Sequence, residues 1–185
     1  MNKTNWIKSC FLAAISTLIL TFCNSEVKES KDVAKEGNMQ KLEEKDARFL
    51  VDATLNGYDQ IKLADVAIKS TTNGAIKKIA EELKDEHSAM ITELNSMASN
   101  KSVTIANTAS EEANATAIDL KASSPGNFDK DWLKKIEDLH KGTVKTYEDA
   151  SNESIDATIK SWASVTLIKI RGHLDRIKKL ADNIK

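Results

Sequence analysis

The stretch AIKKIAEELKDEHSAMITELNSMA, residues 75–98, decides the fold of this 185-residue chain. Its apolar side chains return every three or four residues, which is the spacing of one face of an α-helix. The residues on that face are, in order, Ile76, Leu83, His87, Met90 and Leu94. The pattern predicts a long helix over residues 74–99 that buries one side and carries a histidine in the middle of that side.

The same periodicity predicts three more long helices, over residues 46–71, 128–150 and 156–184. Asn73 and Gly74 suit a tight turn between the first two helices, and Asn127 is expected to cap the third. The connection between the second and third long helices is too long for a simple loop and is predicted to hold a short helix over residues 110–121. We therefore expect an all-α protein, a four-helix bundle of two helical hairpins joined by a long crossover, whose third long helix runs parallel to the second.

The start of the chain has a different composition. Lys3 and Lys8 precede the apolar run CFLAAISTLILTF, residues 10–22, which is too short to span a bilayer. A short apolar run behind positive residues is typical of a signal peptide, here residues 1–22. Leu20 lies three residues before Cys23, which resembles a bacterial lipobox, so lipidation of Cys23 is expected.

Phe22 occupies a position where a lipobox usually has a small residue, so ordinary signal cleavage and retention as a membrane anchor stay open as alternatives. If Cys23 is lipidated and Cys10 leaves with the signal, no thiol remains for chemistry. Residues 23–45 are polar and are predicted to form a flexible tether, with the bundle domain over residues 46–185. The expected location is the cell envelope, at the outer membrane or its periplasmic face, with the membrane as partner through the N-terminal lipid.

Composition excludes several other functions. Charged residues make up 30 % of the chain, yet 27 basic and 28 acidic residues leave a net charge of -1, with no basic stripe that predicts a nucleic-acid partner. No glycine-rich phosphate loop and no nucleophile elbow occur in the sequence. We therefore assign no catalytic residue from the sequence, and it specifies neither a protein partner nor an oligomeric state.

The chain has three histidines, and each lies on the apolar face of a predicted helix. Gln60 and His87 lie equally far from the turn between the first two helices, so an antiparallel hairpin should place them at one level. His140 and His173 are placed in the same way around the turn between the last two helices. We expect these four residues to form a polar layer across the core, with Glu137 one turn from His140.

Four segments occur in order over residues 46–182, namely FLVDATLNGYDQIKLADVA, AIKKIAEELKDEHSAMITELNSMA, FDKDWLKKIEDLH and WASVTLIKIRGHL. Their order and spacing resemble the bacterial domain-of-unknown-function family 4142, exported proteins with a ferritin-like helical bundle. The resemblance implies that the histidines of this chain match those of the family, and it implies no activity. The family commonly has Glu at Gln60 and Asp before two of the histidines, whereas here Glu86 precedes His87 and Leu139 precedes the next.

The layer admits three interpretations. A ferritin-type di-iron centre needs two Glu-x-x-His pairs and two further Glu residues, and only Glu137 with His140 has that spacing, which disfavours it. A single transition-metal ion, zinc, copper or nickel, suits three neutral imidazoles with one more donor. The hypothetical metal residues are His87, His140, His173, Glu137 and Gln60. The third interpretation is a hydrogen-bonded polar layer without metal.

The sequence favours a lipid-anchored cell-envelope protein of unknown activity, whose ferritin-like bundle acts as a binding or structural module. The alternative is a metal-dependent redox or stress-protection protein that uses the histidine layer. In either case the apolar surroundings predict histidine pKa values below about 6.5, because burial disfavours the imidazolium form. Glu137 is expected to oppose this effect at His140.

Overall fold

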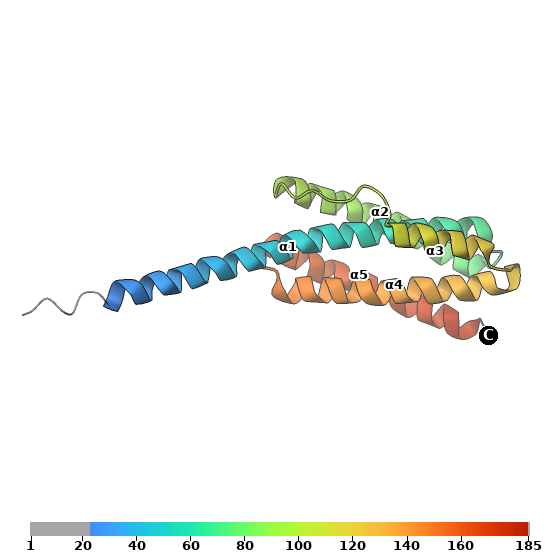
Figure 1. The fold of residues 1–185 in the computed structure, drawn as a ribbon. Coiled ribbons are helices and arrows are strands. Elements are labelled where there is room, and N and C mark those ends of the chain that lie inside the picture. The colour runs from blue at the N-terminus through green and yellow to red at the C-terminus, as the bar shows by residue number, and fades with distance from the viewer. Residues whose placement is uncertain (1–22, 185) are drawn as a thin grey trace, which may run out of the picture. The chain divides into compact units, whose positions relative to one another are not determined.

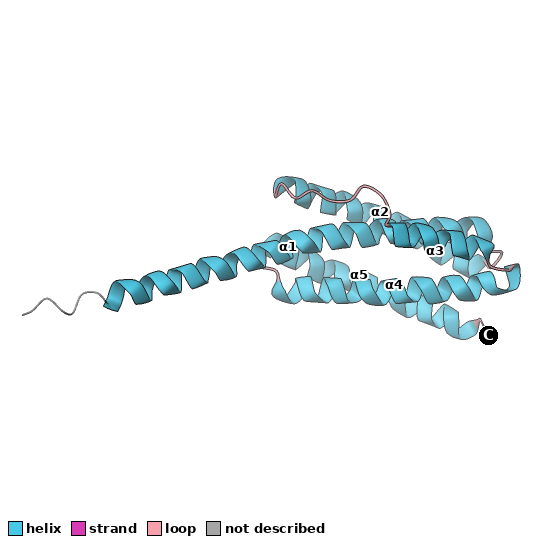
Figure 2. Cartoon of the chain, viewed as in Figure 1, coloured by secondary structure: helices cyan, strands magenta, loops and turns pink. Residues whose placement is uncertain are grey.

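The computed structural model describes the backbone of residues 23–184 and the side chains of residues 43–184. This part of the chain is all-α, as predicted, and contains no strand (Figures 1 and 2). Its helices are α1 (Cys23–Ser70), α2 (Gly74–Asn100), α3 (Glu111–Ala122), α4 (Pro125–Glu153) and α5 (Ala157–Asn183). The contacts divide the chain after residue 38, within α1, and the helical bundle comprises the residues from Met39 onward. The predicted signal peptide, residues 1–22, lies outside the described residues.

Four long helices, α1, α2, α4 and α5, make up the bundle (Figure 1). Contacts between them show their relative directions. The short turn at residues 71–73 makes α1 and α2 antiparallel, and Lys84 contacts Asp65 at 2.8 Å. Lys45 contacts Glu153 at 2.6 Å near the end of α4, and Thr71 donates to Asp129 at 2.6 Å near its start, so α1 and α4 are antiparallel as well. The helices α2 and α4 therefore run in the same direction.

The helix starts follow local capping chemistry. Asn73 and Asp156 cap α2 and α5, each accepting two backbone N–H groups through its side chain. The start of α4 corrects the prediction: the helix begins at Pro125 rather than Phe128, and Asn127 lies inside it. Proline suits the first helical turn because the missing N–H has no intrahelical acceptor there and φ is already helical.

The short helix α3 is docked on α1 through one carboxylate. Asp59 accepts the backbone N–H of Ser110 at 2.7 Å and its hydroxyl at 2.9 Å. The Ser110 hydroxyl oxygen in turn accepts the backbone N–H of Ala113 at 3.0 Å, which caps α3. The predicted helix over residues 110–121 is thus present and is held against the first hairpin.

Residues 23–45, predicted as a flexible tether, are helical in the structure, since α1 begins at Cys23. The segment is rich in Glu and Lys, which have high helix propensity. Its polar composition argues against a packed core of its own, but it does not decide between coil and a single solvated helix. The role of the segment as a tether stays a prediction. None of the helices over residues 23–184 is long and apolar enough to cross a membrane.

Two apolar clusters fill the bundle. The first lies at the end of the α1–α2 turn, is built from all five helices and contains Trp132, which is 0 % exposed. The second lies at the other end and contains Phe49 and Tyr147, whose rings pack edge to face at 5.2 Å. Along α2 the first cluster ends at Leu83 and the second begins at Met90. The core residues of α2 between these positions, including His87, therefore lie at a separate level between the two clusters.

Gly57 provides a test of how closely α1 packs against α2. A Cβ atom at Gly57 would lie 2.9 Å from Cγ1 of Ile91, whereas nothing lies within 4 Å of one added at Gly172. We expect Gly57→Ala to lower the free energy of unfolding by about 1–2 kcal/mol, because the overpacking outweighs the better helix propensity. Gly172→Ala, the matched control, should raise it by about 0.5–1 kcal/mol. Urea denaturation measures both, and two variants of equal stability would contradict the close contact.

Candidate metal centre

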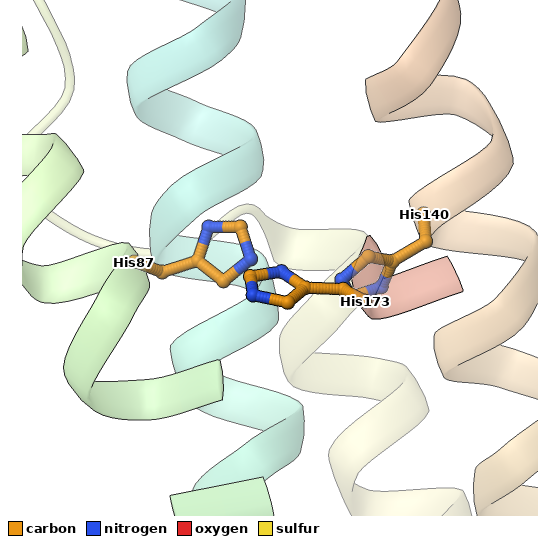
Figure 3. Close-up of side chains that lie close together, drawn as sticks. All are labelled: His87, His140 and His173. Atoms are coloured by element: carbon orange, nitrogen blue, oxygen red, sulfur yellow. The ribbon is translucent and has the colours of Figure 1, made fainter. Parts of the chain in front are cut away.

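Three helices direct one histidine each into the level between the two apolar clusters: His87 from α2, His140 from α4 and His173 from α5 (Figure 3). Their exposed fractions are 2 %, 0 % and 1 %. Each belongs to the buried stripe of its helix, because residues three, four or seven apart share one face. The prediction that all three histidines face the core is confirmed.

The three rings meet in one place. Their centroids are 5.7 Å apart for His87 and His140, and 5.6 Å apart for each pair that includes His173. One ligand atom from each residue lies within 4.8 Å of the other two. Among the described residues, this is the one group of three or more His, Cys, Asp or Glu side chains with such spacing.

Hydrogen bonds assign the tautomers of two rings. Nδ1 of His140 lies 2.9 Å from the carbonyl oxygen of Ile136. A carbonyl only accepts, so Nδ1 carries the proton and Nε2 keeps its lone pair. Nε2 of His173 lies 3.0 Å from a carboxylate oxygen of Glu86. That nitrogen therefore donates, and Nδ1 of His173 keeps the lone pair.

The opposite nitrogens are buried and find no partner. Nε2 of His87, Nε2 of His140 and Nδ1 of His173 have no hydrogen-bond partner among the described protein atoms. A buried polar atom left in this state costs about 1–3 kcal/mol. The three atoms lie in one place, so a single ligand could contact all of them.

Gln60 of α1 is a buried amide next to Thr143, one turn along α4 from His140. Its side chain is 0 % exposed, and its Nε2 donates to Oγ1 of Thr143 at 3.0 Å. The hydroxyl of Thr143 donates to the carbonyl of Leu139 at 2.9 Å, so its oxygen must accept from Gln60. This direction assigns the amide of Gln60 and leaves its Oε1 buried without a partner in the described structure.

Glu137, the predicted carboxylate of the site, is not in the histidine group. Its side chain is partly exposed, and its Oε1 pairs with Lys141 at 2.9 Å. The carboxylate that contacts the layer is Glu86, on α2, which reaches across to His173 on α5. Sequence analysis missed this role because Glu86 lies next to His87 at the edge of a helix face, and the sequence does not say which helix borders that edge.

Burial lowers the pKa of all three imidazoles below the ordinary 6.5. For His87 the lowering is large and comes first from burial, then from the charges that the other two rings would carry. Burial lowers the pKa of His140 to about 3, against the opposing effect of its bond to Ile136. Burial also lowers the pKa of His173, and Glu86 opposes it there. The predicted direction is confirmed, but the opposing carboxylate acts on His173 rather than on His140.

The arrangement can bind one metal ion through neutral nitrogen. Zinc–imidazole bonds of about 2.0–2.1 Å in a tetrahedral site separate the nitrogens by about 3.3 Å. Ligand atoms that already lie within 4.8 Å of one another reach that spacing by small rotations of the side chains. No cysteine or carboxylate of the described residues belongs to the group, so the chemistry is that of a neutral nitrogen site.

A comparison with known families matches residues 31–180 to a family model described as "Domain of unknown function (DUF4142)". The match begins inside the segment predicted as a tether and ends three residues before the end of α5. No curated protein and no solved structure matches the chain.

The acid stability of the metal-free protein tests the protonation state of the layer. A base whose folded pKa lies below its unfolded value stabilises the fold above the unfolded pKa, and this contribution disappears as pH falls. For His140 the window runs from 6.5 down to about 3, at about 1.4 kcal/mol per pH unit for each proton taken up. Urea denaturation with chelator present should therefore show a steep loss of stability below pH 6.5.

His140→Leu should reduce that slope by about one third, since one of three titrating groups is gone. Glu137→Gln, on the same helix and outside the layer, should leave the slope unchanged. Equal slopes for the wild-type protein and His140→Leu would show that His140 is not neutral and buried in the folded state.

Proposed function

The chain belongs to the DUF4142 family, and we propose that its ferritin-like four-helix bundle is a transition-metal-binding module in which His87, His140 and His173 hold one ion. A single observation carries this proposal. Three buried imidazole nitrogens at one level have no hydrogen-bond partner among the described protein atoms, and the tautomers of His140 and His173 leave a lone pair on two of them. A metal ion is the one common ligand that accepts an electron pair from all three at once.

The contacts behind the rings support the same function. Histidine ligands of metals usually donate their second ring N–H to a carbonyl or carboxylate, which sets the tautomer and the ring orientation. His140 donates to the carbonyl of Ile136 and His173 donates to the carboxylate of Glu86. Both contacts leave the lone pair on the nitrogen that lacks a partner, as metal binding requires.

Gln60 is the proposed fourth donor, through its buried Oε1. The bond from its Nε2 to Thr143 holds the amide in one orientation, so the oxygen and not the nitrogen is free for the ion. Glu137 is left out of the centre, since Lys141 holds its carboxylate.

Three imidazoles with one amide oxygen suit zinc, copper or nickel, whereas magnesium and calcium prefer oxygen ligands throughout. The absence of carboxylates from the histidine group of the described residues also disfavours a ferritin-type di-iron centre, which needs four of them. The burial of the rings supports retention of the ion, because catalytic zinc sites keep a position open to water or substrate. We therefore assign binding, and no catalytic step, to the centre.

Metal content tests the proposal. The protein purified without chelators from metal-replete cells should carry about one zinc, copper or nickel ion per chain by mass spectrometry. His87→Ala and His173→Ala should each remove most of it, whereas Glu137→Gln should keep it. Metal at 100 times its dissociation constant should also stabilise the wild-type fold by about 2.7 kcal/mol. Less than about one tenth of an ion per chain under these conditions would end the proposal and leave a polar layer without metal.

We further propose that the chain is exported and anchored in the cell envelope through a lipid on Cys23. This proposal is supported by the sequence alone: the apolar run of residues 10–22 behind Lys3 and Lys8, and Leu20 at the lipobox spacing. An extracytoplasmic bundle would bind metal ions where no cytosolic thiol pool competes for them.

Radiolabelled palmitate tests the anchor. We expect the label to enter the wild-type protein and to be absent from Cys23→Ala, which should accumulate as an unprocessed precursor. Cys10→Ala is the control, because Cys10 lies in the predicted signal peptide and its loss should leave labelling unchanged. A wild-type protein without label would show that Phe22 blocks recognition and that one of the two alternative fates applies.

A further inference from the structure

A cleft of about 610 Å³ opens to solvent between α1, α3 and α4. Its charged lining consists of Asp52, Asp59, Glu112, Asp138 and Lys135. Four carboxylates against one amine make the cleft electronegative. Narrow clefts lined by charge of one sign concentrate counter-ions and accelerate their association.

Two of these carboxylates have structural duties and two do not. Asp59 holds Ser110 at the start of α3, and Asp138 pairs with Lys141. Asp52 and Glu112 take part in no ion pair among the described residues. The docking of α3 against α1 therefore places Glu112 in the lining of the same cleft as Asp52.

The residues that line the cleft flank members of the polar layer along α1 and α4. Asn56 and Leu63 line it from α1, one turn before and one turn after Gln60. Leu139 and Gly142 line it from α4 and immediately precede His140 and Thr143. Gln60 and Thr143 are themselves buried, at 0 % and 1 % exposed, and are joined by a hydrogen bond. That bond joins α1 to α4 between the positions on each helix that line the cleft.

We propose that this acidic cleft is the route by which a divalent transition-metal cation reaches the histidine centre, with the Gln60–Thr143 hydrogen bond as the gate at its floor. The inference rests on the proposed function, since an entry route requires a metal centre to which it leads. The two claims can still be tested separately, because the centre could bind an ion that enters between other helices of the bundle.

The gate needs little rearrangement. The hydroxyl of Thr143 keeps its own bond to the carbonyl of Leu139, so only the amide of Gln60 has to move. Gly142 leaves room on the cleft side, since nothing lies within 4 Å of a Cβ built there. When the amide returns to Thr143, its Oε1 is again oriented as a buried donor for the ion.

Rates of Co²⁺ uptake, followed by the visible absorption of the bound ion, test the charge of the route. Asp52→Asn combined with Glu112→Gln should slow uptake by the wild-type chain about tenfold at low ionic strength, with the same final stoichiometry. The difference should shrink at high salt, where exposed charges are screened. Glu81→Gln with Asp85→Asn removes equal charge from α2, outside the cleft, and should load at the wild-type rate.

Two further variants test the passage and the gate. Gly142→Leu should slow uptake and release together and leave the affinity unchanged, whereas Gly172→Leu, equally open but on α5, should change neither rate. Thr143→Val should speed both rates by removing the acceptor of the gate bond. If the wild-type protein binds one Co²⁺ and the charge, Gly142 and Thr143 variants all load at its rate, the route is overturned while the proposed function stands. A wild-type protein that binds no Co²⁺ overturns both.

Discussion

The convergence of three uncharged imidazoles in the middle of an apolar core is the constraint on which the rest of the bundle depends. His87, His140 and His173 come from three different helices, and each must reach the same level for the rings to lie 5.6–5.7 Å apart. The apolar clusters above and below do not by themselves fix the axial register of the helices, since one aliphatic side chain packs against many others. The polar layer does, because a shift of one turn would leave each nitrogen facing hydrocarbon.

Several features that look independent serve this alignment. Gly57 lets α1 approach α2 closely beside Ile91. The Gln60–Thr143 bond joins α1 to α4 one helical turn from His140. Glu86 joins α2 to α5 through His173. Polar contacts thus join the long helices in two pairs, α1 with α4 and α2 with α5, and the apolar clusters supply most of the burial on either side.

The protonation state of the layer also matters for what it can bind. Each imidazole is kept neutral by burial, which destabilises the protein in acid and keeps the ring lone pairs free of protons at neutral pH. A bound cation would use the same lone pairs that burial protects from protons. Binding of metal and loss of protons are therefore linked, and a carboxylate-lined cleft over the same seam would favour the cation as well.

The sequence by itself determined the helices and the faces they bury, because a period of 3.6 residues is a local property that AIKKIAEELKDEHSAMITELNSMA displays without help from the rest of the chain. It also determined the level of the histidines, since equal distances from a tight turn become equal heights in an antiparallel hairpin. It misplaced the start of α4, where weak local preferences compete. Only the tertiary structure decided that Glu86 and not Glu137 contacts the rings, and which nitrogen of each ring stays without a partner. Those choices depend on which helix borders which edge and on side-chain reach between helices, and neither is encoded in the spacing along one helix.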